Sequence, residues 1–163
     1  MSAQTDLNRF VKKFSGALKD MVSKKNMKEL GEYAISIIVK RTRGGKGLTS
    51  PTNPRGLKQL KPLSKRYVQQ RAKASLDSST SAKQSNLTYT GIMLRSMRVK
   101  NFRDGSVRIG PSDRKRKGGK TNSQIGDYVT DQGRPFNGLA PSEQKKLGKF
   151  YDANIASVVK RRL

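Results

Sequence analysis

The sequence predicts an α+β fold, in which long N- and C-terminal helices pack on a small antiparallel β-sheet with extended basic loops. Apolar residues recur with helical periodicity near both ends of the chain. Between them, two short apolar segments flank an Asp-Gly pair, which is typical of a β-hairpin. We expect one domain with three regions: an N-terminal helical region (1–43), a basic loop, short helix and linker (44–86), and a module of sheet plus C-terminal helix (87–163).

Two helices are predicted in the first region. The first follows Thr5 as N-cap, and the second begins near Asn26, which forms a capping-box-like pair with Glu29, and ends near Gly44. We expect the first helix to pack on its own domain; the alternative is a membrane-surface helix, although its apolar face lacks a tryptophan. The apolar positions are Leu7, Phe10, Val11, Phe14, Leu18, Met21 and Val22 in the first helix, and Met27, Leu30, Ala34, Ile37 and Ile38 in the second.

The second region is rich in loop-forming residues. Residues 44–62 hold several prolines and glycines without periodicity, which predicts a long loop. A short helix capped by Ser64 follows, and the Ser/Thr-rich stretch 75–86 is typical of a linker.

The third region contains the predicted hairpin. Its strands are expected in "MLRSMRVKNF" and "SVRIG". A two-residue turn would set Lys100 opposite Ile109, which mixes the two faces and predicts a bulge or a longer loop. Residues 112–122 are polar and basic, so they predict a loop that does not pack on the core. Residues 124–133 favour either a short helix or a strand. The last helix is expected to start at about Pro141 and to run almost to residue 163, with an apolar face that includes Leu147, Phe150, Tyr151, Ile155, Val158 and Val159.

Positive charge dominates the composition. The chain has 163 residues, with 36 lysines and arginines against 11 acids and a net charge of +25. Residues 33–126 hold most of this excess, and such clustering favours an anionic partner over a solvated surface of mixed charge. The candidate contacts to DNA or to an acidic partner are Arg41, Arg43, Lys46, Arg55, Arg114, Lys115, Arg116, Lys117 and Lys120.

The sequence argues against an enzyme, and we expect no cofactor, metal or catalytic residue. Cysteine and histidine are both absent, which removes thiolate ligands, disulfides and histidine general bases. "GGKT" at 118–121 resembles the end of a phosphate-binding loop, but Arg114 stands where the motif requires glycine. Asp127 and Asp131 are more typical of solvated acids than of an Mg²⁺ site. No apolar run reaches the length of a membrane span, and the N-terminus lacks a signal segment, so we expect a cytosolic protein when made.

Three stretches in order resemble the tail-completion and virion-morphogenesis proteins of tailed bacteriophages. They are "LKPLSKRYVQQRAK", "LTYTGIMLRSM" and "YVTDQGRPFNGLAPSEQKKL", and the resemblance covers roughly residues 57–163. The matching positions are Leu87, Thr90, Gly91 and Leu94 in the element that opens the sheet, Val107, Ile109 and Gly110 in a strand, and Gly133, Arg134, Pro135 and Phe136 in the turn before the last helix.

The resemblance implies a structural virion protein. It would form a homo-oligomeric neck or tail-completion ring that joins the portal to the tail, assembled in the host cytoplasm, with portal, adaptor and tail proteins as partners and non-specific DNA contact. The alternative is a basic nucleic-acid-binding protein of ribosomal type, which the composition fits equally well. In either case we expect residues 133–136 to anchor the last helix, with Phe136 packed beneath it.

Overall fold

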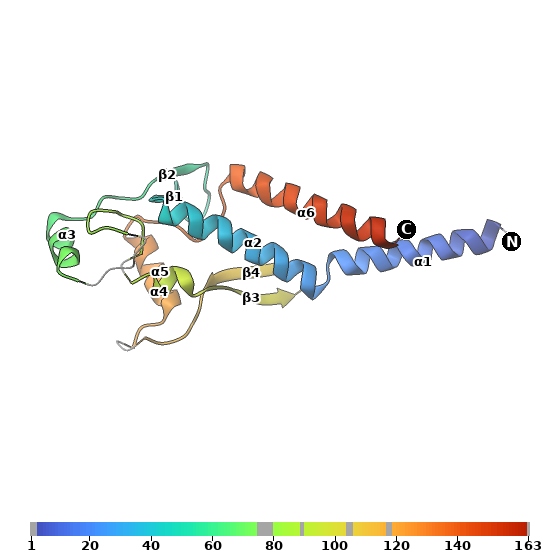
Figure 1. Ribbon diagram of the computed structural model, residues 1–163, viewed down its shortest axis with the longest axis horizontal. Helices are drawn as coiled ribbons and strands as arrows, with labels where there is room; N and C mark the ends of the chain where they lie inside the picture. The colour runs from blue at the N-terminus through green and yellow to red at the C-terminus, as the bar shows by residue number, and fades with distance from the viewer. Residues whose placement is uncertain (1–2, 75–79, 89, 104–105, 117–118, 163) are drawn as a thin grey trace.

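The structure is a computed structural model that describes residues 3–74, 80–88, 90–103, 106–116 and 119–162. Its fold is α+β, as predicted, with helices near both ends and two antiparallel hairpins (Figure 1). The helices are α1 (Ala3–Met21), α2 (Lys24–Arg43), α3 (Lys65–Ala72), α4 (Ile92–Arg95), α5 (Asn122–Asp131) and α6 (Pro141–Arg162). The strands are β1 (Lys46–Leu48), β2 (Leu57–Gln59), β3 (Met97–Arg103) and β4 (Ser106–Pro111).

Helix α2 is the centre of the arrangement. It contacts α6 and both strands of the β3–β4 hairpin, so it lies between them (Figure 1). Helix α1 extends away from this body at one end, while α3, α5 and the β1–β2 hairpin lie toward the other end. The buried core joins α2, α4, the start of β3 and the turn before α6 through Ile38, Met93, Leu94, Met97 and Phe136.

The predicted N-caps of the first two helices are wrong, although the second helix does begin near Asn26. Helix α1 already includes Ala3, so Thr5 lies inside it. Helix α2 begins at Lys24, because the Ser23 side chain accepts a hydrogen bond from the Asn26 backbone N–H at 3.4 Å. Asn26 is not the cap: its side-chain amide donates to the Asp20 carbonyl at 2.6 Å and ties α2 to the last turn of α1. The predicted end at Gly44, in contrast, is confirmed.

The predicted long loop 44–62 is also partly wrong, because it contains the β1–β2 hairpin. Each strand has only three residues, too few for an alternating pattern to be visible in the sequence. A distant segment, the turn before α6, holds the hairpin in place, since the Leu48 N–H donates to the Pro135 carbonyl at 2.8 Å. Within the predicted linker 75–86, residues 75–79 lie outside the described residues. Asn86, its last residue, and Thr88 just after it are fully buried.

The short helix α3 and the bulged hairpin are confirmed. The Ser64 side chain accepts from the Tyr67 N–H, as expected for the N-cap of α3. In the hairpin, Val99 pairs with Ile109 and Asn101 with Arg108, so the register shifts at Lys100. The shift returns Val99 to the same face as Ile109, which resolves the mixed faces. The start of the first predicted strand is wrong, since residues 92–95 form α4. The predicted turn at Asp104-Gly105 lies outside the described residues.

Two helical glycines give a stability prediction with an internal control. A Cβ at Gly31 in α2 would lie 2.6 Å from Val99 Cγ2 and 3.2 Å from Val107 Cγ2, whereas a Cβ at Gly148 in α6 meets nothing within 4 Å. Because valine is stiff at χ1, Gly31→Ala should destabilise the protein by about 1–3 kcal/mol. Gly148→Ala should stabilise it by about 0.5–1 kcal/mol. Urea unfolding of both variants checks the opposite signs, and a stabilising Gly31→Ala would contradict the close packing of α2 on the hairpin.

Helix α1 packs on the body along only one edge. It contacts α6 and, less extensively, α2, and Ala17 is buried. The expectation that the first helix packs on its own domain is therefore confirmed for the part of α1 that carries Ala17. Four apolar side chains on α1 and just after it are 44–53% exposed: Val11, Phe14, Leu18 and Val22.

Candidate functional site

The predicted turn before the last helix packs at the heart of the fold. Phe136 is fully buried and lies in the core cluster with Ile38 and Leu94. Gly133 has a φ of 77°, in the left-handed region that glycine tolerates best. The turn is therefore anchored in the core through Phe136, which packs with residues of α2, α4 and β3. The described core cluster contains no residue of α6, so the packing of Phe136 beneath the last helix stays a prediction.

Arg41, near the end of α2, binds the segment between this turn and the start of α6. Its Nη1 donates to the Gly138 carbonyl at 3.1 Å and to Glu143 Oε2 at 2.6 Å, and its Nη2 donates to the Phe136 carbonyl. Glu143 Oε2 also accepts from the Ala140 N–H at 2.9 Å, at the start of α6. Both side chains of this ion pair are nearly inaccessible to solvent.

The prediction that Arg41 contacts DNA or an acidic partner is consequently wrong. Its guanidinium is buried and paired within the chain. Burial lowers the pKa of Arg41, and the Glu143 carboxylate opposes that change. Arginine nevertheless stays charged at neutral pH, so the interaction is a buried ion pair.

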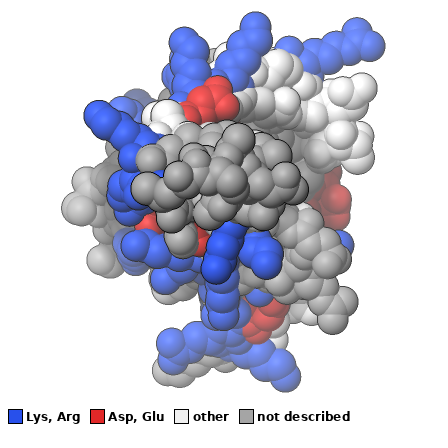
Figure 2. All heavy atoms as spheres, turned by 90° about the vertical axis from the view of Figure 1, so that its right-hand side faces the viewer, with Lys and Arg blue, Asp and Glu red and all other residues white. Residues whose placement is uncertain are grey.

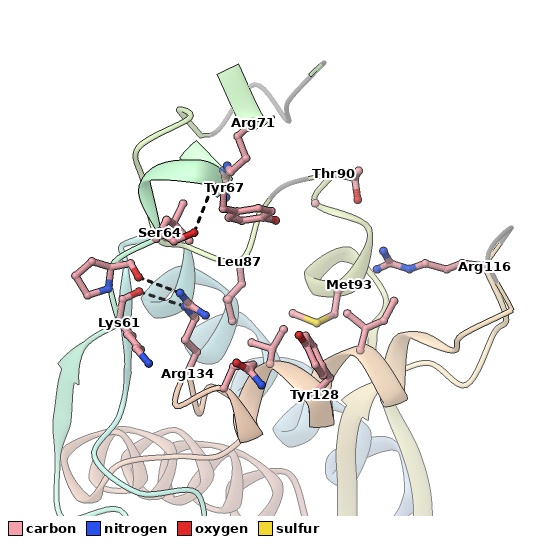
Figure 3. A pocket seen from close by; sticks show the side chains of 16 residues that line it. Lys61, Ser64, Tyr67, Arg71, Leu87, Thr90, Met93, Arg116, Tyr128 and Arg134 are labelled. Carbon is pink, nitrogen blue, oxygen red and sulfur yellow. Dashed lines mark hydrogen bonds between the residues drawn. The ribbon is translucent and has the colours of Figure 1, made fainter. Parts of the chain in front are cut away.

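Arg134 connects the turn to the segment that precedes α3. Its Nε donates to the Lys61 carbonyl at 3.2 Å and its Nη2 donates to the Pro62 carbonyl at 3.0 Å (Figure 3). These bonds fix the segment before α3 against the segment between α5 and α6. Arg134 is thus a turn anchor, and it also lines the cleft formed between those segments.

This cleft has a volume of about 690 Å³ and is bordered by α3, α4 and α5. Its apolar lining comes mainly from Leu63, Leu87, Met93, Ile125 and Val129, and two tyrosines, Tyr67 and Tyr128, stand on either side (Figure 3). Leu87 has a φ of 57°, an uncommon backbone conformation for a residue other than glycine.

Four cationic side chains line the same cleft: Lys61, Arg71, Arg116 and Arg134. None of the described lining residues is acidic. Arg71 Nη2 donates to Thr80 Oγ1 at 3.2 Å and to the Ser81 carbonyl at 3.1 Å, and Arg116 Nε donates to Asn122 Oδ1 at 2.6 Å. Burial lowers the pKa of Arg116. The cleft thus combines an apolar floor with arginines that neutral acceptors hold in place.

No protein-family model, curated protein or solved structure matches this chain. The helices that the structure describes include none with the length and apolar character needed to cross a membrane.

The other predicted basic contacts do not form one patch. Lys46 and Arg55 are exposed on the β1–β2 hairpin and its turn, while Arg114, Lys115 and Lys120 are exposed on the loop before α5. Figure 1 places these two segments on opposite sides of α2. Arg43 and Arg116 are half-buried, and Lys117 lies outside the described residues. Seen end-on from the side of α1, lysine and arginine side chains project at the top, left and bottom of the view, with a few acids between them (Figure 2).

The loop before α5 packs more than the sequence predicted. Ser112 and Asn122 at its ends are buried, and the Asn122 amide donates to Ser112 Oγ at 3.2 Å. Thr121, the last residue of "GGKT", forms a reciprocal capping box with Gln124 and starts α5, so residues 122–131 are helical. On that helix Asp127 and Asp131 are exposed, and the described residues contain no group of three metal-ligating side chains.

Sequence reasoning missed most of the cleft. Tyr67 and Arg71 are four residues apart after the Ser64 cap, so they share one face of α3, and this spacing was readable in the sequence. Lys61, Tyr128 and Arg116 join them only through tertiary packing, which no local pattern indicates.

Proposed function

We propose that the protein is a structural subunit of a tailed-phage virion, forming a homo-oligomeric neck or tail-completion ring between the portal and the tail. The observation that carries the proposal is the exposed apolar stripe of Val11, Phe14, Leu18 and Val22. A helix advances about 100° per residue, so Val11, Phe14 and Leu18 on α1 fall within an arc of about 60°, and Val22 follows in the turn after the helix. Together they form a continuous apolar face, of the kind that marks an interaction site.

A second copy of the chain is the occupant we propose for this stripe. Helix α1 extends beyond the body of the molecule, so a neighbouring subunit can reach it (Figure 1). Each subunit would cover the stripe of the next, and such a head-to-tail contact closes into a ring when the rotation permits. The exposed cations of the two basic segments would then face DNA or acidic protein surfaces.

The arrangement of the resemblance motifs supports the same proposal. Leu94, from the element that opens the sheet, and Phe136, from the turn, belong to one buried cluster. Leu87 and Ile109 pack against that cluster. Motifs separated in sequence therefore form one structural module, which is what a shared fold requires.

Substitution on α1 tests the assembly. The double variant Val11→Ser/Leu18→Ser should shift the molar mass measured by light scattering from that of an oligomer to that of a monomer, because it removes two apolar contacts per interface. Lys12→Ser/Lys19→Ser is the matched control, since both lysines are exposed on the same helix at the same spacing. The control should assemble normally. A wild-type protein that stays monomeric up to high concentration, alone and with portal protein, would refute the ring.

A further inference from the structure

We propose that the cleft bordered by α3, α4 and α5 binds a short acidic segment of a partner protein, with one apolar side chain of that segment seated on its floor. The cleft is built from one chain, so this proposal does not depend on the ring.

The floor of the cleft accounts for the apolar part of the ligand. Leu87, Met93, Ile125 and Val129 present hydrocarbon and thioether surface into a space that has room for a large side chain. Met93 also belongs to the core cluster, so the floor is supported from below. Tyr67 and Tyr128 are 39% and 59% exposed and border the entrance (Figure 3). Apolar pockets with a few fixed polar groups are the usual form of a binding site.

The arginines account for the acidic part. In Figure 3, Arg116 and Arg134 approach the cleft from opposite sides of Met93. Each donates to neutral oxygens, and among the described residues no carboxylate pairs with either of them. Their positions are fixed before any ligand arrives, which reduces the entropy lost on binding. Two guanidinium groups flanking an apolar floor match a segment with carboxylates on both sides of an apolar residue.

The tyrosines favour a peptide over a nucleic acid. Binding of single strands relies on bases stacked on open aromatic faces. Here the Arg71 guanidinium carbon lies 5.9 Å from the centre of the Tyr67 ring, and Lys120 Nζ lies 5.6 Å from that of Tyr128. Each ring therefore already has a cation over one face, and the surface between the rings is aliphatic.

The net charge favours a different protein over a second copy. The chain has 11 acids against 36 lysines and arginines, and it holds few segments with a surplus of acids. The α1 stripe is flanked by Lys12 and Lys19, so a basic cleft would repel it. An acidic partner has the complementary charge.

Fluorescence anisotropy with the full-length chain tests the proposal. The probes are labelled seven-residue peptides in which two glutamates flank one phenylalanine or leucine at spacings of one, two or three residues. At least one should bind with a micromolar Kd. Replacing its glutamates with glutamine, or its apolar residue with serine, should each weaken binding by roughly tenfold.

Variants of the cleft locate the binding. Arg116→Gln should weaken the best peptide by roughly fivefold or more, because it removes one charged partner. Gln132→Glu places a negative charge, which repels the peptide's glutamates, on an exposed lining residue. The change does not disturb the core, so it should weaken binding even if the Arg116 variant unfolds. Arg114→Gln, in the same loop but outside the lining, should leave the Kd unchanged. The proposal fails if no peptide binds below millimolar Kd, if Gln132→Glu has no effect, or if an eight-residue oligothymidylate displaces the peptide and binds more tightly.

Discussion

Phe136→Ala is expected to lower the free energy of unfolding by about 3–5 kcal/mol, the usual cost of removing a buried phenylalanine ring. The side chain is fully buried among residues of α2, α4 and β3. A Cβ at Gly126 of α5 would lie 3.4 Å from Phe136 Cζ, so α5 also packs closely on the ring. These elements leave little freedom to collapse into the space that alanine creates. Urea-induced unfolding followed by circular dichroism measures the loss.

The control for Phe136 is an exposed aromatic residue. Tyr128 is 59% exposed on α5, so Tyr128→Ala should cost less than about 1 kcal/mol. If both variants unfolded at the same urea concentration as the wild type, Phe136 could not be the anchor of the last helix.

Arg41→Met is expected to destabilise the protein by a similar amount, about 3–5 kcal/mol, because it leaves the Glu143 carboxylate buried without its partner. It also removes the donor to the Phe136 and Gly138 carbonyls. Glu143→Gln in the wild type should destabilise as well, since it strands the arginine charge. In the Arg41→Met background the same change should stabilise, because it removes the uncompensated carboxylate while glutamine can still accept from the Ala140 N–H.

This reversal of sign separates charge pairing from packing. A purely steric role for Glu143 would give Glu143→Gln the same small effect in both backgrounds. The exposed pair Lys28–Glu32, with an N–O distance of 3.6 Å, is the control, and Glu32→Gln should change stability by less than about 0.5 kcal/mol. Urea unfolding of the four proteins in the Arg41–Glu143 cycle measures the coupling.

The parts of the fold that could be predicted from the sequence are those with local causes. The Ser64 cap determines where α3 begins, and the conflict between Lys100 and Ile109 predicts a bulge or a longer loop, of which the structure has the bulge. The long apolar stripes of α2 and α6 were likewise readable. Local ambiguity remained where two caps competed, as at Ser23 and Asn26, because both are favourable N-cap residues.

The candidate site was much less predictable. Arg41 looks like any other cation in a basic stretch, and its burial depends on Glu143, which lies 102 residues further along the chain. The β1–β2 hairpin depends in the same way on the distant Pro135 carbonyl. The cleft draws side chains from segments that no periodicity connects. Contacts of this kind arise from tertiary packing, and local composition carries no signal for them.

The distance along the chain between Arg41 and Glu143 has a consequence for synthesis on the ribosome. The buried side chains Ile38 and Arg41 of α2 contact Phe136 and Glu143, which are made about a hundred residues later. Closing so long a loop is slow, and until then the nascent chain carries the apolar and cationic face of α2 uncovered. Such exposed surfaces are the ones that chaperones protect and that aggregate when unprotected. The buried face of α2 is therefore covered only after the segment from Phe136 to Glu143 has been made.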